Sequence, residues 1–124
     1  MSDLKPTGVK IKLGNEEYGM RFTLNAIDDI QDHFNIDISE LNGLFSDTKH
    51  QIRNIRYILT VLINEDIDCV ADETGEKRPH VDEKYVGRHI DIANINSVIG
   101  RVYATVNSGT PKTDEDNDDP MKSE

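Results

Sequence analysis

The sequence predicts a mainly α-helical fold that opens with a β-hairpin, an α+β domain of about four helices. Apolar and polar residues alternate on both sides of an early Gly-Asn pair, which is typical of a hairpin. From residue 24 onward the apolar residues recur at every third or fourth position, which indicates amphipathic helices. The 124 residues fit one domain with a core of modest size.

Residues 8–22, GVKIKLGNEEYGMRF, form the predicted hairpin, with Gly14 and Asn15 as its turn. Gly14 supplies the positive φ that a type II′ turn needs. This register pairs Leu13 with Glu16, Lys12 with Glu17, Ile11 with Tyr18 and Val9 with Met20. The apolar face then also carries Phe22, and a one-residue slip would lose that face. Because an isolated hairpin is marginal in water, we expect its apolar face to lie on another element.

The first helix is expected to follow Thr23, a good N-cap residue, and to end near Asn35, which tolerates a left-handed C-cap. Its apolar stripe is Leu24, Ile27, Ile30 or Gln31, and Phe34, with Asp28, Asp29 and Asp32 facing outward. Residues 37–46, DISELNGLFS, indicate a short helix or turn that ends near Gly43.

The strongest helical pattern begins near Thr48. Its stripe consists of Ile52, Ile55, Ile58, Leu59, Leu62 and Ile63, and is widened by Tyr57 and Val61. Lys49, Arg53 and Arg56 form a basic strip on the outer side of this helix. Residues 64–80, NEDIDCVADETGEKRPH, break the pattern with a Thr-Gly pair and a proline, so we expect a polar loop there.

Two further helices are expected in the last third of the chain. Residues 81–90, VDEKYVGRHI, favour a short helix that Asp82 caps. The final stripe is Ile95, Val98, Ile99, Val102, Tyr103 and Val106, with Asn94 or Asp91 as the cap and Gly109 after the end. We expect residues 1–7 to be a flexible leader, residues 8–108 a single domain, and residues 109–124 a disordered acidic tail.

Charge and composition limit the classes of function. The chain carries 14 basic and 24 acidic side chains, for a net charge of −10 that repels phosphate backbones. It has no tryptophan and only 6% aromatic residues, so stacking platforms for bases are not expected. Cys69 is the single cysteine, which favours a reducing compartment. MSDLKPTG lacks a secretory h-region and IRYILTVLI is too short for a membrane span, so we expect a cytoplasmic protein.

Catalytic and metal-binding patterns are not evident in the sequence. His80 with Asp82 and His89 with Asp91 form two H-x-D units, but neither matches a known metal-ligand spacing. The chain contains no G-x-S-x-G, P-loop or G-x-G-x-x-G motif. Acidic neighbours would raise the pKa of the Cys69 thiol rather than activate it. We therefore expect no enzyme, no cofactor and no metal, and instead some apolar surface left over for a partner or a second copy.

The order of these pieces resembles the tail assembly chaperones of long-tailed phages and prophages. The likeness covers about residues 8–108 and rests on KIKLGNEEYGMRFTLNAIDDIQDHFN, IRNIRYILTVLINED and YVGRHIDIANINSVIGRVYATVNSG. That family opens with a short hairpin, here Gly14 to Tyr18, and a helix starting like Phe22-Thr23-Leu24-Asn25-Ala26. Its second helix ends in acidic residues, here Asn64-Glu65-Asp66, and a closing amphipathic helix precedes a polar tail. The 67–80 segment is longer and more charged than in the family, and the tail is unusually acidic.

The resemblance implies a non-catalytic role in the cytoplasm of a bacterial host. Such chaperones bind the apolar-rich tape measure protein, help to recruit tail tube subunits around it, and are absent from the mature virion. Homo-oligomers are compatible with this role, and neither nucleic acid nor membrane is implied as a partner. The residues we expect to contact a client or a second copy are Tyr18, Met20 and Phe22 on the hairpin, and Tyr57 and Val61 beside the central stripe.

Two other classes of function stay open at this point. One is an acidic inhibitor that mimics nucleic acid, which requires carboxylates spaced like phosphates on a rigid face. The densest acidic run instead falls in the expected disordered tail. The other is a small regulatory or toxin-neutralising protein. Neighbouring genes for a tape measure protein and a tube protein would decide against both.

Overall fold

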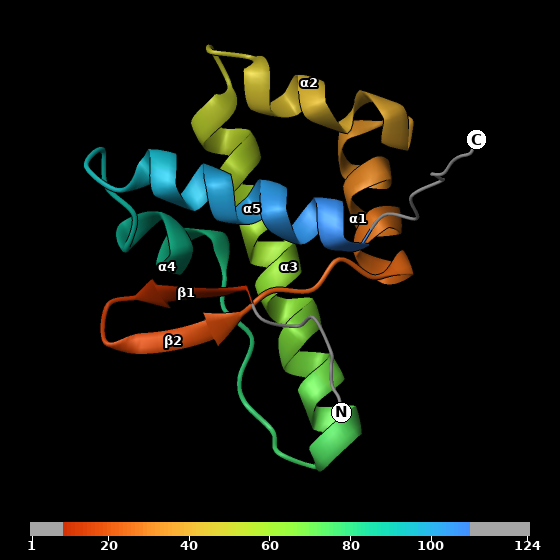
Figure 1. The fold of residues 1–124 in the computed structure, drawn as a ribbon, viewed down its shortest axis with the longest axis vertical. Helices are drawn as coiled ribbons and strands as arrows, with labels where there is room; N and C mark the ends of the chain where they lie inside the picture. Colours follow the sequence, from red (N-terminus) through yellow and green to blue (C-terminus); the bar gives the residue numbers. More distant parts are fainter. Residues whose placement is uncertain (1–8, 110–124) are drawn as a thin grey trace, which may run out of the picture.

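A computed structural model describes residues 9–109 and shows a mainly helical protein with an N-terminal antiparallel hairpin, as the sequence predicts (Figure 1). The elements in chain order are β1 (Lys10–Leu13), β2 (Glu16–Gly19), α1 (Leu24–Phe34), the 3-10 helix η1 (Ile38–Glu40), α2 (Leu41–Ser46), α3 (Gln51–Thr74), α4 (Glu83–Arg88) and α5 (Ile95–Gly109). The described part thus has five α-helices, because the 37–46 segment, predicted as a short helix or turn, forms α2. The predictions of a flexible leader and a disordered tail lie outside the described residues, apart from Gly109, which ends α5.

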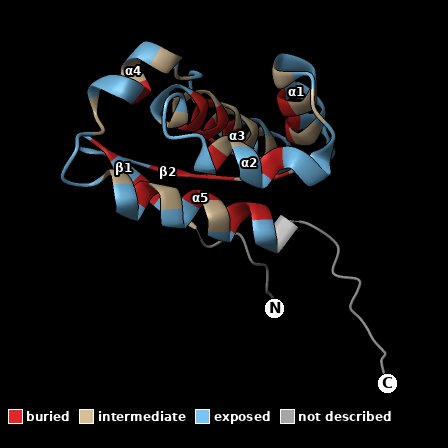
Figure 2. Ribbon diagram, turned by 90° about the horizontal axis from the view of Figure 1, so that it is seen from above, coloured by how far each residue is buried: buried red, intermediate tan, exposed pale blue. Residues whose placement is uncertain are grey.

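The hairpin has the predicted register. Ile11 pairs with Tyr18, Lys12 with Glu17, and Leu13 with Glu16, and Gly14 has the expected positive φ of 66°. Val9 and Met20 lie just beyond the paired residues. The strands lie between α5 and α3, with β1 contacting α5 and β2 contacting α3 (Figure 2). This placement covers the apolar face, as the marginal stability of an isolated hairpin requires.

Helix α1 has the predicted ends, and its predicted stripe holds for Ile30, which is buried, and for Ile27 and Phe34, which pack against the core, but not for Leu24. The Thr23 hydroxyl accepts a hydrogen bond from the Ala26 amide at 3.2 Å, and Asn35 closes the helix in the left-handed region with φ 56°. The prediction that Leu24 lies on the buried stripe is wrong, because Leu24 is 82% exposed. Ala26 and Ile30, one helical turn apart, are the buried pair, and Leu24 sits two positions earlier on nearly the opposite side.

Helix α2 does not end at Gly43, as the sequence predicted, but continues to Ser46. Leu41 and Phe45 lie one turn apart and both are buried, so their packing outweighs the roughly 1 kcal/mol that a helical glycine costs. The Asn54 side-chain amide donates to the Leu44 carbonyl at 3.0 Å and ties α2 to α3.

The predicted polar loop over residues 64–80 is wrong for its first part, because α3 continues to Thr74. Gly75, with φ 83°, supplies the left-handed C-cap, so the Thr-Gly pair marks the end of the helix. Ile67 is buried one turn after Ile63 and carries the apolar stripe onward through charged neighbours. Arg21 fixes this extension, since its guanidinium donates to Asp66 at 2.9 Å and to Glu73 at 2.6 and 2.9 Å.

Helix α4 has the predicted cap: an Asp82 carboxylate oxygen accepts from the Tyr85 amide at 2.8 Å. Before α5, Asp91 and Asn94 exchange side-chain-to-backbone hydrogen bonds of 2.9 and 3.1 Å. The buried face of α5 carries Val98, Val102 and Val106, three members of the predicted stripe.

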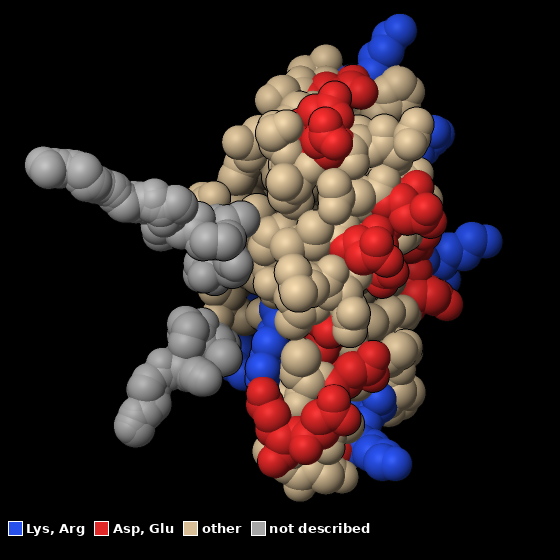
Figure 3. Space-filling view, turned by 90° about the vertical axis from the view of Figure 1, so that its right-hand side faces the viewer, with Lys and Arg blue, Asp and Glu red and all other residues tan. Residues whose placement is uncertain are grey.

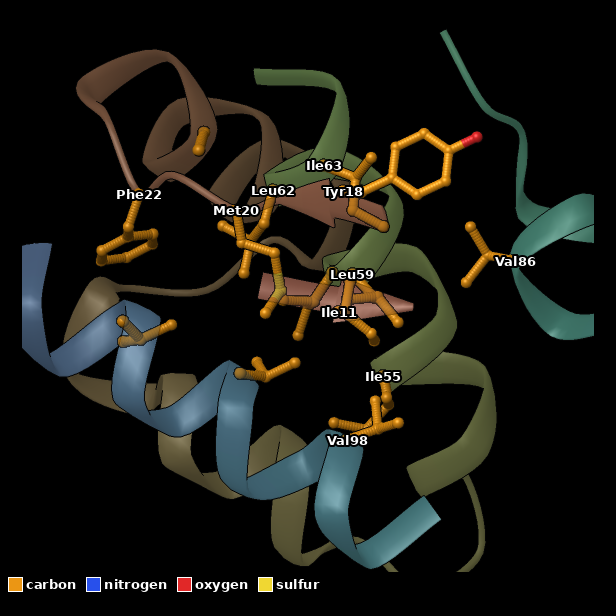
Figure 4. Packing of buried hydrophobic residues seen from close by; sticks show 14 of the residues in the cluster. Ile11, Tyr18, Met20, Phe22, Ile55, Leu59, Leu62, Ile63, Val86 and Val98 are labelled. Atoms are coloured by element: carbon orange, nitrogen blue, oxygen red, sulfur yellow. The ribbon is translucent and has the colours of Figure 1, made fainter. Parts of the chain in front are cut away.

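One hydrophobic core joins the hairpin to the helices (Figure 4). Helix α3 lies at its centre and contacts α1, α2, α4 and β2. Ile58, Leu59, Leu62 and Ile63 on α3 are fully buried, and the hairpin residues and α5 valines pack around them. In the described part of the chain, no helix combines the length and apolar character needed to cross a membrane.

Candidate functional site

A groove of about 540 Å³ opens where the first half of α3, helix α4 and the segment leading into α5 meet. In Figure 1 this is the side where α4 and the 89–94 connection lie. Its lining is dominated by isoleucines and cationic side chains; it consists of Ile52, Ile55, Arg56, Lys84, Gly87, Arg88, Ile90, Asp91, Ile92 and Ile95. We call this surface the isoleucine groove.

The floor of the isoleucine groove leaves apolar surface uncovered. Ile92 is 79% exposed and Ile52 is 59% exposed, although isoleucine is among the residues most often buried in proteins. Ile90 and Ile95 are half-buried beside them, and Ile55 joins the floor to the core. Two of the four exposed large apolar residues of the described chain therefore meet in one groove. Contiguous exposed apolar surface of this kind marks an interaction site.

The rim of the groove is basic. Lys84 and Arg88 lie one turn apart on α4, and Arg56 faces them from α3. Arg56 Nε lies 3.7 Å from Glu83 Oε1, too far for a hydrogen bond, and this buried nitrogen has no hydrogen-bond partner in the described structure. Asp91 is the one acidic side chain among the lining residues. The groove therefore combines an apolar floor with three cations and a single anion.

Gly87 allows α4 to approach Arg56 closely. A Cβ placed on Gly87 would lie 2.9 Å from Arg56 Cδ, which is closer than two such carbons can come. The absence of a side chain at this position lets the arginine stem lie against α4, along the groove wall.

Local hydrogen bonds fix the segment that carries Ile90 and Ile92. His89 Nδ1 lies 2.9 Å from the Tyr85 carbonyl, and the His89 ring contacts the hairpin turn, 3.0 Å from a Cβ placed on Gly14. The Asp91–Asn94 exchange closes the other end of the segment. The exposed isoleucines thus project from an ordered connection.

Three residues that the sequence predicted as contact residues lie in the core. Tyr18, Met20 and Phe22 are 7%, 3% and 7% exposed, and Figure 4 shows them among the side chains of α3 and α5. Arg78 covers the Tyr18 ring at 3.9 Å, and burial raises the pKa of Tyr18. The hairpin face is covered within this chain, so it offers no open surface, and our proposals rest on other residues.

Tyr57 and Val61 are half-buried on α3, away from the isoleucine groove. The Tyr57 ring stacks on His33 of α1 at 3.7 Å and meets the edge of Phe34. Burial, followed by the nearby Asp29 charge, raises the pKa of Tyr57. Tyr57 therefore packs α3 on α1, and the structure does not bring it together with the three hairpin residues.

The remaining titratable candidates are dispersed over the described residues. Cys69 lies half-buried on the extension of α3, and its thiol pKa is raised, mainly by burial, with the acidic neighbours adding to it. His80 pairs with Asp68 at 2.8 Å rather than with Asp82. Within residues 9–109, no three His, Cys, Asp or Glu side chains gather closely enough to hold a metal ion.

The charge of the groove rim differs from that of other faces. Figure 3 shows the side on which α1 lies in Figure 1, and there acidic side chains form several patches. Asp28, Asp29 and Asp32 of α1 are exposed, as the sequence predicted. The isoleucine groove is thus a basic-rimmed apolar surface on a molecule with a net charge of −10.

Comparison with known proteins found no matching family model, no matching curated protein and no matching solved structure.

Sequence reasoning missed the groove for identifiable reasons. Ile52 fits the helical stripe and was placed on it, Ile90 was placed at the end of the short helix predicted over residues 81–90, and Ile92 belongs to no predicted helix. The signal was present in RHIDIANI, where two isoleucines alternate with polar residues in a segment of little regular structure. What the sequence could not supply is the packing of α4, which brings Arg88 beside these isoleucines.

Proposed function

We propose that this protein is a non-catalytic tail assembly chaperone that binds an apolar helical segment of a phage tape measure protein in the host cytoplasm. Support for the family comes from the sequence, in which the order of hairpin, helices and polar tail resembles that of tail assembly chaperones. The observation that carries binding is the isoleucine groove, where Ile52 and Ile92 stay exposed on an ordered surface.

An amphipathic client helix presents apolar residues along one side and can lay them into such a groove. The groove is shallow enough to leave Ile92 mostly exposed, which suits reversible binding better than a deep pocket does. Reversibility matters because tube subunits have to displace the chaperone before the virion is complete. The net charge of −10 keeps a loaded complex soluble.

Co-expression tests this proposal. The chain is expressed with the tape measure protein encoded beside it, and the soluble yield is compared with that of the tape measure protein alone. We expect the client to be soluble only in the presence of the chain and to copurify with it. If its solubility is unaffected, or no tape measure gene adjoins this one, the proposal fails and the inhibitor or regulatory readings take its place.

A further inference from the structure

We infer that the isoleucine groove selects an amphipathic helix whose apolar ridge is flanked by carboxylates. This inference rests on the proposed function, because it specifies the chemistry of the client segment. It is independent of the family resemblance, since it follows from the charges and the exposure of the groove.

The composition of the rim departs from that of the chain. Acidic side chains outnumber basic ones by 24 to 14 in the whole sequence, whereas the groove lining holds three cations and one anion. A basic surface kept on an acidic protein favours partners of negative charge and repels positive ones. Charge complementarity therefore assigns carboxylates to the segment that docks there.

The cations of the rim have unused hydrogen-bonding capacity. Arg56 Nε is buried without a hydrogen-bond acceptor among the described residues, and Lys84 and Arg88 form no ion pair within that range. Glu83 lies 3.7 Å from Arg56 Nε and leaves the guanidinium incompletely paired. A carboxylate from a bound helix would pair with the exposed Lys84 and Arg88, or with the outer nitrogens of the part-exposed Arg56, since Arg56 Nε itself is buried. Arginine accommodates carboxylates in a two-pronged geometry.

The apolar floor distinguishes a peptide from a phosphate polymer. Nucleic acid phosphates could also approach the cations, but they would leave the isoleucines uncovered and meet the repulsion of the acidic chain. A helix with leucine or isoleucine at positions i, i+3 or i+4, and i+7 covers the floor. Acidic residues next to that ridge then lie at the height of the rim.

Synthetic peptides provide the direct test, with the full chain as the binding protein. Three helical peptides of about 18 residues share one leucine ridge and differ only in their flanking residues, which are Glu, Gln or Lys. We expect the Glu peptide to bind about tenfold more tightly than the Lys peptide at low salt, with the Gln peptide between them. Raising NaCl to about 0.5 M should remove most of this difference, because salt screens exposed charge pairs.

Charge reversal on α4 locates the preference. The Lys84→Glu/Arg88→Glu double variant should bind the Lys peptide better than the Glu peptide. Lys77→Glu/Arg53→Glu makes the same change of net charge at two exposed positions that do not line the groove, and should keep the preference of the natural chain. Ile92→Asp should weaken all three peptides at least fivefold, because it places a charge on the apolar floor.

The possible outcomes separate the two proposals. Equal binding of the three peptides would overturn the carboxylate preference while leaving the co-expression result, and with it the proposed function, intact. A tenfold preference for Glu together with an indifferent tape measure protein would show the charge preference of the groove and refute the proposed function, and with it the assignment of that preference to a tape measure client.

Two other occupants would overturn the assignment. If Asn and Gln in place of the acidic residues at 114–119 raised the affinity for the Glu peptide tenfold, the occupant would be the chain's own tail. If Ile92→Asp converted a dimer to a monomer, the occupant would be a second copy. Affinity for the same peptides tests the tail, and sedimentation of the Ile92→Asp variant tests the second copy.

Discussion

Isoleucines of the groove and of the core should respond differently to the same truncation. Replacing isoleucine by alanine removes three carbons, worth about 2.4 kcal/mol when fully buried at about 0.8 kcal/mol for each. Ile58 is 0% exposed, so Ile58→Ala loses this amount and a cavity term, and should cost about 3 to 5 kcal/mol.

The groove residues lose much less by the same reasoning. Ile92 is 79% exposed, and the fifth of its surface that is buried corresponds to about 0.5 kcal/mol. Ile52 is 59% exposed and loses about 1 kcal/mol, of which the higher helix propensity of alanine returns about 0.4 kcal/mol. For a domain of this size, Ile58→Ala should lower Tm by at least 10 °C and Ile92→Ala by less than about 3 °C.

Thermal unfolding followed by circular dichroism measures all three variants. Ile92→Ala should retain stability and yet lose affinity for the leucine-ridge peptides. If Ile92→Ala destabilised the protein as much as Ile58→Ala, Ile92 would be a core residue in solution and the isoleucine groove would be closed.

Three further predictions concern the helices that frame the core. Arg21→Met should cost about 1 to 3 kcal/mol in urea unfolding, because it leaves the part-buried Asp66 carboxylate without its cation, and an unchanged midpoint would refute that role. Gly75→Ala should destabilise by about 1 kcal/mol because φ is 83°, whereas Gly43→Ala, in a helix with open space around it, should stabilise by up to about 1 kcal/mol; equal Tm shifts would contradict both assignments. Burial raises the pKa of Cys69, so its thiolate fraction at pH 8 lies below that of an unfolded chain and iodoacetamide should react faster after urea is added; equal rates would place Cys69 in an open loop.

Local signals in the sequence were sufficient for the hairpin turn and for several helix caps. The Gly-Asn turn, the Thr23 and Asp82 caps and the left-handed Asn35 are decided by a few neighbouring atoms, and each agrees with the structure. Helix ends that depend on distant packing were predicted wrongly. Helix α3 continues through a charged segment because Ile67 is buried in the core and the Arg21 guanidinium donates a hydrogen bond to the Asp66 carboxylate.

The candidate site was less accessible to sequence reasoning than the fold. Periodicity identifies apolar stripes but cannot say which members another element covers. Tyr18 was expected to contact a partner and is covered, whereas Ile52 was placed on the apolar stripe of the central helix and is exposed. Tyr18 is covered because Arg78 lies over its ring and Tyr85 of α4 meets its edge, whereas Ile52 lies in the open groove. Neither arrangement is encoded in a local pattern.

The most direct test of the central claim compares Ile92→Asp with Leu24→Asp as partners for the tape measure protein in co-expression. Both replace a highly exposed apolar residue, 79% and 82% exposed, by the same charge, but Leu24 does not line the groove. We predict that Leu24→Asp keeps the client soluble at the level of the natural chain and that Ile92→Asp leaves it in the pellet. Equal soluble yields with the two folded variants would contradict the isoleucine groove as the client-binding surface.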